Sequence, residues 1–252
     1  MHAVLLLLRN LTARNLKVKY QRSFLGFLWT LLNPLATTLT LVAVFSAIVR
    51  LPVEHYWAFL LSGFFVWNFM NMTVNSATHV LPQHAPVIRA AKVPAEAFVL
   101  AAITSRLVEF LIELALVVGA IAFFHHGTLP ASFLMLPALI AAQVLFAVGL
   151  VLPIATLGAF YDDVQHSLPI VFMVLFYISP VFYPASLVPE SAAGLYALNP
   201  IAALLGLYHT VLYEGLVPSY TAVLDMLIVS CVVCVLGCMV FRRYRHTFAE
   251  VL

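Results

Sequence analysis

Long apolar runs, separated by short polar or charged breaks, dominate the pattern along this chain. Residues 24–49, for example, contain no charged side chain. A helix needs about 20 apolar residues to cross the hydrocarbon core of a bilayer. We therefore expect an all-α polytopic membrane protein. The runs predict six transmembrane helices, at residues 24–49, 56–77, 97–124, 133–160, 164–182 and 220–241.

Composition supports this interpretation, because 64% of the 252 residues are hydrophobic and only 9% are charged. A water-soluble domain of this length cannot bury so much apolar surface. No internal repeat, soluble domain or long linker is evident, so residues 1–252 are expected to form a single transmembrane domain. An apolar stretch at residues 4–8 precedes the N-terminal charges, the reverse of a signal peptide, so no cleavage is expected.

The basic residues indicate the orientation of the helices. Ten of the twelve Lys and Arg residues fall in three clusters, near the N-terminus, in the middle and at the C-terminus. Short cytoplasmic segments carry such an excess of positive charge, and six spans place all three clusters on one side. Both termini are therefore expected in the cytoplasm. The predicted cytoplasmic segments are an interface arm at 1–23, a loop with a short helix at 78–96 and a tail at 242–252.

The segment at residues 183–218 has two possible interpretations. It contains an apolar stretch at 201–212, opened by Asn199 and Pro200 and closed by Gly215, which is typical of a discrete helix. If this helix crossed the membrane, the basic tail would lie outside, against the charge rule. We therefore predict short external helices, re-entrant or interfacial, before the last span.

Three charges lie inside the third predicted span. Arg106, Glu109 and Glu113 fall within about 60° of one another on one helix face. Charges at membrane depth are costly and normally face a partner or a watery cavity. Arg106 can pair with Glu109 at i+3. Two roles fit the three residues: an ion-pair network that joins helices, or a direct role on a transport route.

Aromatic residues are concentrated in two of the runs and in the segment that follows the second one. Aromatic belts at the membrane interfaces explain many such residues. The alternative is a lining along which sugar rings slide, since aromatic faces offer stacking without deep polar wells. The candidates for such a lining are Phe64, Trp67, Phe176, Tyr177, Phe182 and Tyr183.

Enzyme and metal signatures are missing from the sequence. It has no Gly-x4-Gly-Lys-Ser/Thr loop for phosphate and no His-Glu-x-x-His pair. Nine histidines are present without a carboxylate at metal-binding spacing. Cys231, Cys234 and Cys238 share one helix face in the last run, where we interpret them as packing residues. We expect no catalytic residue, no metal site and no cofactor in this chain.

Four motifs resemble the membrane subunit of ABC-2 type exporters, in the group that exports polysaccharides and polyol phosphates. They are KVKYQRSFLGFLWTLLNP at 17–34, GFFVWN at 63–68, VIRAAKVPAE at 87–96, and YISPVFYP at 177–184 followed by LNP at 198–200. Asp162 departs from the family pattern, which commonly has Arg before the Asp. Asn33-Pro34 resembles O-antigen and teichoic-acid permeases, whereas capsule exporters tend to have Glu-Pro.

The resemblance implies a homodimer that works with two separate ATPase subunits, which bind ATP and Mg²⁺. It implies export of a lipid-linked glycan, O-antigen or a related polymer, across the bacterial cytoplasmic (inner) membrane. The chain itself would be a transport subunit and not an enzyme, and would bind no nucleic acid. Its arm and its 78–96 loop would contact the ATPase. The implied coupling residues are Arg14, Lys17, Lys19, Arg22, Arg89, Lys92 and Glu96.

Other functions remain open at this point. One alternative is an ABC-2 exporter of drugs or other lipophilic small molecules, and another is an intramembrane lipid-modifying enzyme. Positive-inside anchoring alone also explains the basic clusters. The enzyme alternative predicts activity from the purified chain by itself, and neighbouring ATPase and glycosyltransferase genes would favour glycan export.

Overall fold

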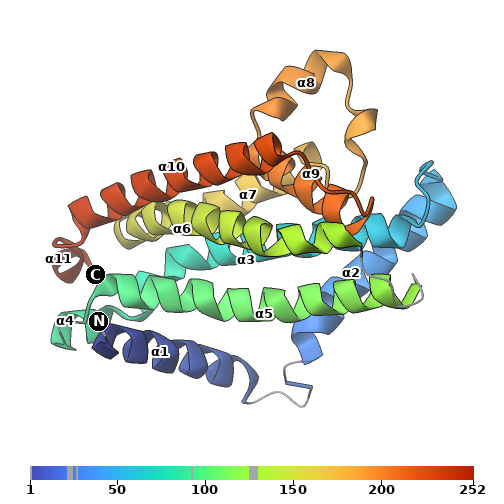
Figure 1. Ribbon diagram of the computed structural model, residues 1–252. Coiled ribbons are helices and arrows are strands. Elements are labelled where there is room, and N and C mark those ends of the chain that lie inside the picture. The colour runs from blue at the N-terminus through green and yellow to red at the C-terminus, as the bar shows by residue number, and fades with distance from the viewer. Residues whose placement is uncertain (1, 22–24, 27, 92, 125–129) are drawn as a thin grey trace.

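The computed structural model describes residues 2–21, 25–26, 28–91, 93–124 and 130–252, and every regular element within them is helical. The all-α class predicted from the sequence is therefore confirmed (Figure 1). The α-helices are α1 (His2–Tyr20), α2 (Leu28–Ala43), α3 (Tyr56–Gln83), α4 (Ala85–Ala91), α5 (Ala95–Phe124), α6 (Leu136–Phe160), α7 (Asp163–Ile178), α8 (Glu190–Ala197), α9 (Pro200–Leu212), α10 (Tyr220–Tyr244) and α11 (Phe248–Val251). The shorter elements are a π-helix, η1 (Val44–Val49), and two 3₁₀ turns, η2 (Ala131–Met135) and η3 (Ala185–Leu187).

Four helical segments are long and apolar enough to cross a bilayer: Leu28–Val49, Tyr56–Gln83, Ala131–Phe160 and Tyr220–Tyr244. α5 has 30 residues but carries charges, and α7 has only 16 residues. The structure thus supports a polytopic membrane protein. The count of six spans, which needs α5 and α7, stays a prediction.

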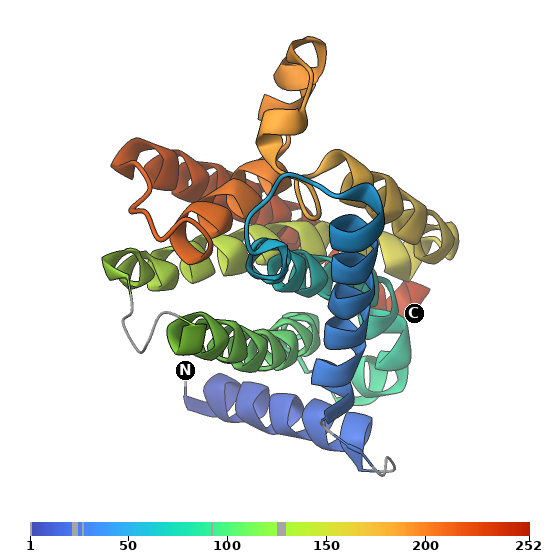
Figure 2. The same cartoon turned by 90° about the vertical axis from the view of Figure 1, so that its right-hand side faces the viewer.

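α3 is the central helix of the bundle. It packs against α5 and α6, as Figure 2 shows, and also against α2, α7 and α9. In the most apolar 18-residue stretch of α3, 72% of the residues are buried inside the protein. In the corresponding stretches of Leu28–Val49 and α10, only 11% and 22% are buried. The apolar surface of those two segments therefore faces outward, which suits contact with lipid or with another membrane protein.

α6 and α10 make the most extensive helix contact among the described residues, and two glycines allow it. A Cβ atom added to Gly237 would lie 2.3 Å from the carbonyl oxygen of Gly149, and one added to Gly149 would lie 2.5 Å from the carbonyl carbon of Val233. Small residues let helix backbones approach in a membrane, where dispersion contacts replace the hydrophobic driving force. The two helices consequently pack backbone against backbone.

Both termini lie at one end of the bundle, beside α4 and α11 (Figure 1). The C-terminal tail is fixed there by Phe248, which is fully buried against Phe241, and by an ion pair between Arg245 and Glu96 at 3.5 Å. α8 projects from the side of the bundle, above α9 and away from the termini (Figure 1). The shared end agrees with the placement of the basic clusters, but the side of the membrane stays a prediction.

α1 runs beside α5 in both views (Figures 1 and 2), and the two helices are in contact. The predicted arm at 1–23 is therefore helical from His2 to Tyr20 and packs along a neighbouring helix. This packing brings the end of α1 to the middle of α5.

Candidate functional site

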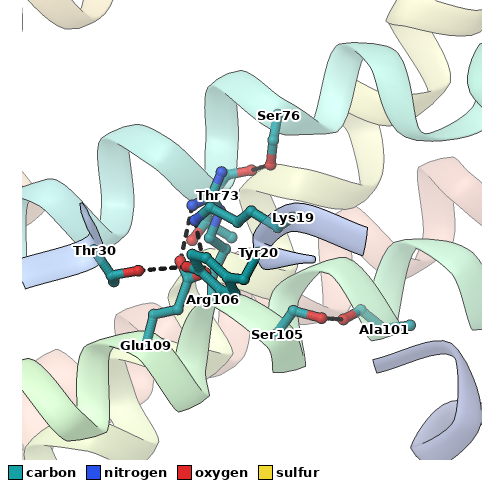
Figure 3. A network of polar contacts seen from close by, with 9 residues as sticks. All are labelled: Lys19, Tyr20, Thr30, Thr73, Ser76, Ala101, Ser105, Arg106 and Glu109. Atoms are coloured by element: carbon teal, nitrogen blue, oxygen red, sulfur yellow. Dashed lines mark hydrogen bonds and ion pairs between the residues drawn. The ribbon is translucent and has the colours of Figure 1, made fainter. Parts of the chain in front are cut away.

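Glu109 on α5 is the centre of a polar cluster that joins α1, α2 and α5 (Figure 3). Its Oε1 accepts hydrogen bonds from Lys19 Nζ at 2.6 Å and from the Tyr20 hydroxyl at 2.5 Å, and its Oε2 accepts one from Arg106 at 2.8 Å. The Tyr20 hydroxyl is also hydrogen-bonded to Thr30 of α2. Because Glu109 is only 5% exposed, these donors compensate the cost of burying its charge.

The cluster also changes the proton affinities of the two α1 side chains. Burial lowers the pKa of Lys19, and the hydrogen bond to Glu109 opposes this effect. Burial raises the pKa of Tyr20, and its hydrogen bond to Glu109 raises it further. Tyr20 therefore stays a neutral donor at physiological pH.

The sequence predicted only part of this cluster. The i+3 ion pair of Arg106 and Glu109 is present. Lys19, which the resemblance assigned to ATPase contact, bonds Glu109 beside the cavity described next, and its coupling role stays a prediction. Tyr20 was missed because no spacing in the sequence relates it to Glu109, 89 positions away, and Thr30 was missed because it joins the cluster only through Tyr20.

A cavity of about 850 Å³ lies next to the cluster, between α2, α3, α5 and α7. Aromatic rings form part of its wall: Trp67 lies 5.7 Å from Phe172 and 5.6 Å from Phe176, centroid to centroid. Carboxamides form another part. The aromatic lining residues on α3 and α7 are Phe64, Trp67, Phe172, Phe176 and Tyr177, and the amide lining residues are Asn33, Asn68, Asn71 and Asn75.

One face of α3 supplies both kinds of side chain. Phe64, Asn68, Asn71 and Asn75 recur at intervals of three or four residues, with Trp67 next to Asn68, which places them along a single helix face. Sequence analysis singled out the aromatics and missed the asparagines, although their i, i+3, i+7 spacing was visible. The wall is therefore amphipathic along its length.

Four of the six residues proposed for a glycan lining border this cavity: Phe64, Trp67, Phe176 and Tyr177. The other two do not. Phe182 instead packs against Phe176, with ring centroids 5.4 Å apart, and the Tyr183 hydroxyl donates to the backbone carbonyl of Tyr177 at 3.1 Å. The structure thus places four of the six at the cavity and the other two against Phe176 and Tyr177 at the end of α7, and their role stays a prediction.

The residues proposed for ATPase contact are dispersed along the chain. Arg14 and Lys17 on α1 and Arg89 on α4 are exposed. Glu96 in the first turn of α5 pairs with Arg245. Arg22 and Lys92 lie outside the described residues. Their coupling role stays a prediction.

The histidine, cysteine and carboxylate side chains that the structure describes do not gather into a metal site. Among the described residues, no group of three or more of them is arranged to hold an ion. His209 on α9 is buried against Gly63 and Phe59, with its ring centroid 4.2 Å from that of Phe59. The polar cluster and the adjoining cavity are therefore the best candidate for the functional site.

Known proteins resemble the chain over nearly its whole length. It is 25% identical over 244 residues to the O-antigen export system permease protein RfbA of Klebsiella pneumoniae, covering 96% of this chain and 93% of that protein. The RfbA protein of Myxococcus xanthus is 27% identical over 247 residues, with 97% and 94% covered. The polysialic acid transport protein KpsM of Escherichia coli is 25% identical over 217 residues, with 82% and 80% covered. Residues 7–213 match the family described as ABC-2 type transporter, so the chain belongs to the ABC-2 type transporter family.

Proposed function

We propose that this chain is the permease subunit of an ATP-driven exporter that moves a lipid-linked polysaccharide, O-antigen or a related cell-surface glycan, across the bacterial cytoplasmic membrane. The observation that carries the proposal is the cavity of about 850 Å³ with its aromatic and amide wall. Membership of the ABC-2 family and near-full-length similarity to O-antigen export permeases support it.

The chemistry of the wall suits a sugar polymer. Aromatic rings stack on the apolar faces of sugar rings, and carboxamides both donate and accept hydrogen bonds, as sugar hydroxyls require. A site for lipophilic drugs needs apolar surface but no row of amides. The asparagines of α3 therefore favour a glycan over the drug-export alternative, and the relatives are transport permeases and not lipid-modifying enzymes.

Two further spans complete the proposed topology. α5 can cross the membrane because its Glu109 is paired and its charged face borders the cavity. α7 is about 24 Å long at 1.5 Å per residue, somewhat short for a 30 Å hydrocarbon core. With Leu28–Val49, α3, Ala131–Phe160 and α10, they give six spans with both termini in the cytoplasm and α8 and α9 on the outer side.

A homodimer and an ATPase partner follow from the same proposal. The outward apolar surfaces of α2 and α7 flank the cavity, so a second copy placed there would join two cavities into one path. The chain carries no phosphate-binding loop in its sequence, so ATP and Mg²⁺ would bind a separate subunit. The exposed cations Arg14, Lys17 and Arg89 are available for that contact.

Deletion of the gene in its host, with complementation, tests the proposal. We expect loss of surface glycan and accumulation of lipid-linked glycan inside the cell. The purified chain should hydrolyse no ATP, and hydrolysis should appear only when the partner ATPase is added. Normal surface glycan in the deletion strain would contradict glycan export, and ATP hydrolysis by the chain alone would contradict its role as a permease subunit.

A further inference from the structure

Glu113 on α5 is a buried carboxyl group that no described residue pairs with. It is 3% exposed and borders the cavity, and it makes no hydrogen bond or ion pair within the part of the chain that the structure describes. Glu109, one turn earlier on the same helix, has three donors at 2.8 Å or less. The two glutamates therefore have different surroundings although they share one helix face.

A buried polar group without a hydrogen-bond partner destabilises a folded protein, and a carboxyl group at membrane depth does so strongly. Packing does not explain Glu113, since an apolar residue of similar size would fill the same space at lower cost. Such a group at the wall of a cavity is typical of a site whose partner is a ligand.

The neighbouring helix supplies polar groups at the same level. α3 and α5 lie side by side in opposite directions: the ring of His84 contacts that of Phe98, and the ring of Phe69 contacts that of Phe110, with centroids 4.6 Å and 5.2 Å apart. Glu113 is one turn beyond Phe110, which brings it close to the level of Asn68.

The amides of α3 at this level are also available. Asn68 makes no side-chain hydrogen bond to any described residue, and the side chain of Asn71 only accepts one, from Asn75 at 2.7 Å. Trp67 adds an aromatic face on the same side of α3. A carboxyl group, two amides and an indole ring thus line one stretch of the cavity.

We propose that Glu113, Asn68 and Asn71 form a binding subsite for the hydroxyl groups of a sugar ring in the middle of the cavity. The Glu113 oxygens accept hydrogen bonds from adjacent ring hydroxyls, the two amides donate and accept the remaining ones, and Trp67 stacks on the apolar ring face. The subsite rests on the proposed export function and specifies how the glycan is held during passage.

The stability of Glu113→Leu distinguishes glycan binding by Glu113 from a purely structural role of this residue. If Glu113 held helices together, Glu113→Leu would destabilise the protein and lose activity for that reason. If Glu113 binds the glycan, Glu113→Leu removes an uncompensated buried group, so the unfolding temperature stays the same or rises while glycan binding falls. Glu113→Gln keeps hydrogen-bonding capacity and shape, and so retains most of the binding.

The experiment uses the full transporter in its host, with a photo-crosslinking amino acid at Met72, which borders the cavity. The probe is the cell's own glycan, detected on the crosslinked band by periodate oxidation and hydrazide labelling. We expect the glycan signal and surface export to fall about tenfold in Glu113→Leu and in Asn68→Leu/Asn71→Leu, in line with the loss of one or two hydrogen bonds. Asp225→Leu on α10, an exposed carboxylate away from the cavity, is the matched control and should behave as wild type.

Three results would overturn the subsite: an unchanged glycan signal in Glu113→Leu, a lower unfolding temperature in that variant, or equal losses in Glu113→Gln and Glu113→Leu. A wild-type transporter that assembles but neither exports nor crosslinks glycan would instead overturn the proposed function, and the subsite with it. The wild-type control thus separates the two failures.

Discussion

Lys19 Nζ lies 2.6 Å from Glu109 Oε1, although the two residues are 90 positions apart in the chain. Together with the hydrogen bond from Tyr20, this ion pair attaches the end of the N-terminal helix α1 to the middle of α5. The same stretch of α5 borders the cavity through Arg106, Glu109 and Glu113. The arm of the protein is therefore in direct contact with the wall of the candidate glycan path.

Removal of the Glu109 carboxylate should destabilise the protein strongly. Glu109→Ala leaves Lys19 and Arg106 close together without a counter-charge, in a site where Glu109 itself is buried. We expect a loss of roughly 1–3 kcal/mol of folding free energy, less than for a fully buried ion pair that loses one partner, because Lys19 and Arg106 are partly exposed to solvent. The midpoint of thermal unfolding, measured by tryptophan fluorescence in detergent, checks this.

Companion variants separate the contributions within this cluster. Arg106→Ala should cost less than Glu109→Ala, because Glu109 keeps Lys19 and Tyr20 as donors. Lys17 is an exposed cation on α1 outside the cluster, so Lys17→Ala should change the free energy of unfolding little. Equal losses in the Arg106 and Glu109 variants would show that Arg106 alone compensates Glu109.

A side chain at Gly237 should separate α6 from α10. Gly237→Ala places a Cβ atom 2.3 Å from the carbonyl oxygen of Gly149, and backbone cannot move aside as a side chain can. We expect a loss of roughly 1–3 kcal/mol, as for other overpacked sites, measured as a lower unfolding midpoint. Gly119→Ala on α5, with no atom within 4 Å of the added Cβ, is the control and should be neutral or slightly stabilising. Equal behaviour of both variants would argue against close backbone packing.

Reversal of charge at Arg89 should uncouple the ATPase. Arg89 is exposed on α4, between two long helices, and charge-assisted bonds to carboxylates favour specific docking. We expect Arg89→Glu to insert normally into the membrane, since the other basic clusters remain, yet to lose co-purification with the ATPase and glycan export. Arg242→Glu makes the same charge change in the exposed tail and should retain both. Normal export by Arg89→Glu would leave topology anchoring as the role of this residue.

Cysteine labelling from either side of the membrane checks the six-span topology. Single cysteines at Arg14 and Arg245 should react only from the cytoplasm, and those at Glu54 and Glu190 only from outside. The reason is that the termini share one end of the bundle while α8 projects away from that end, beside α9 (Figure 1). External labelling at position 245 would mean that α9 spans the membrane and that the number of spans is odd.

Properties that depend on neighbours along the chain were predictable. The apolar runs gave the all-helical class, because hydrophobicity adds up residue by residue along a segment. The pair of Arg106 and Glu109 followed from their i+3 spacing, because an α-helix places such residues on one face wherever it sits. The sequence also predicted a short helix in the 78–96 loop, where α4 is found.

Properties that depend on how helices pack could not be predicted in this way. Lys19 and Tyr20 reach Glu109 only because α1 lies along α5, and Asn68 and Asn71 border a cavity only because α7 brings Phe172 and Phe176 opposite them. A repeat of 3.6 residues defines which side chains share a face, but not which helix that face meets. The sequence by itself therefore determined the class of the protein and the faces of its helices, whereas the tertiary structure decided which faces enclose the candidate glycan path, because contacts between distant segments arise only in the packed bundle.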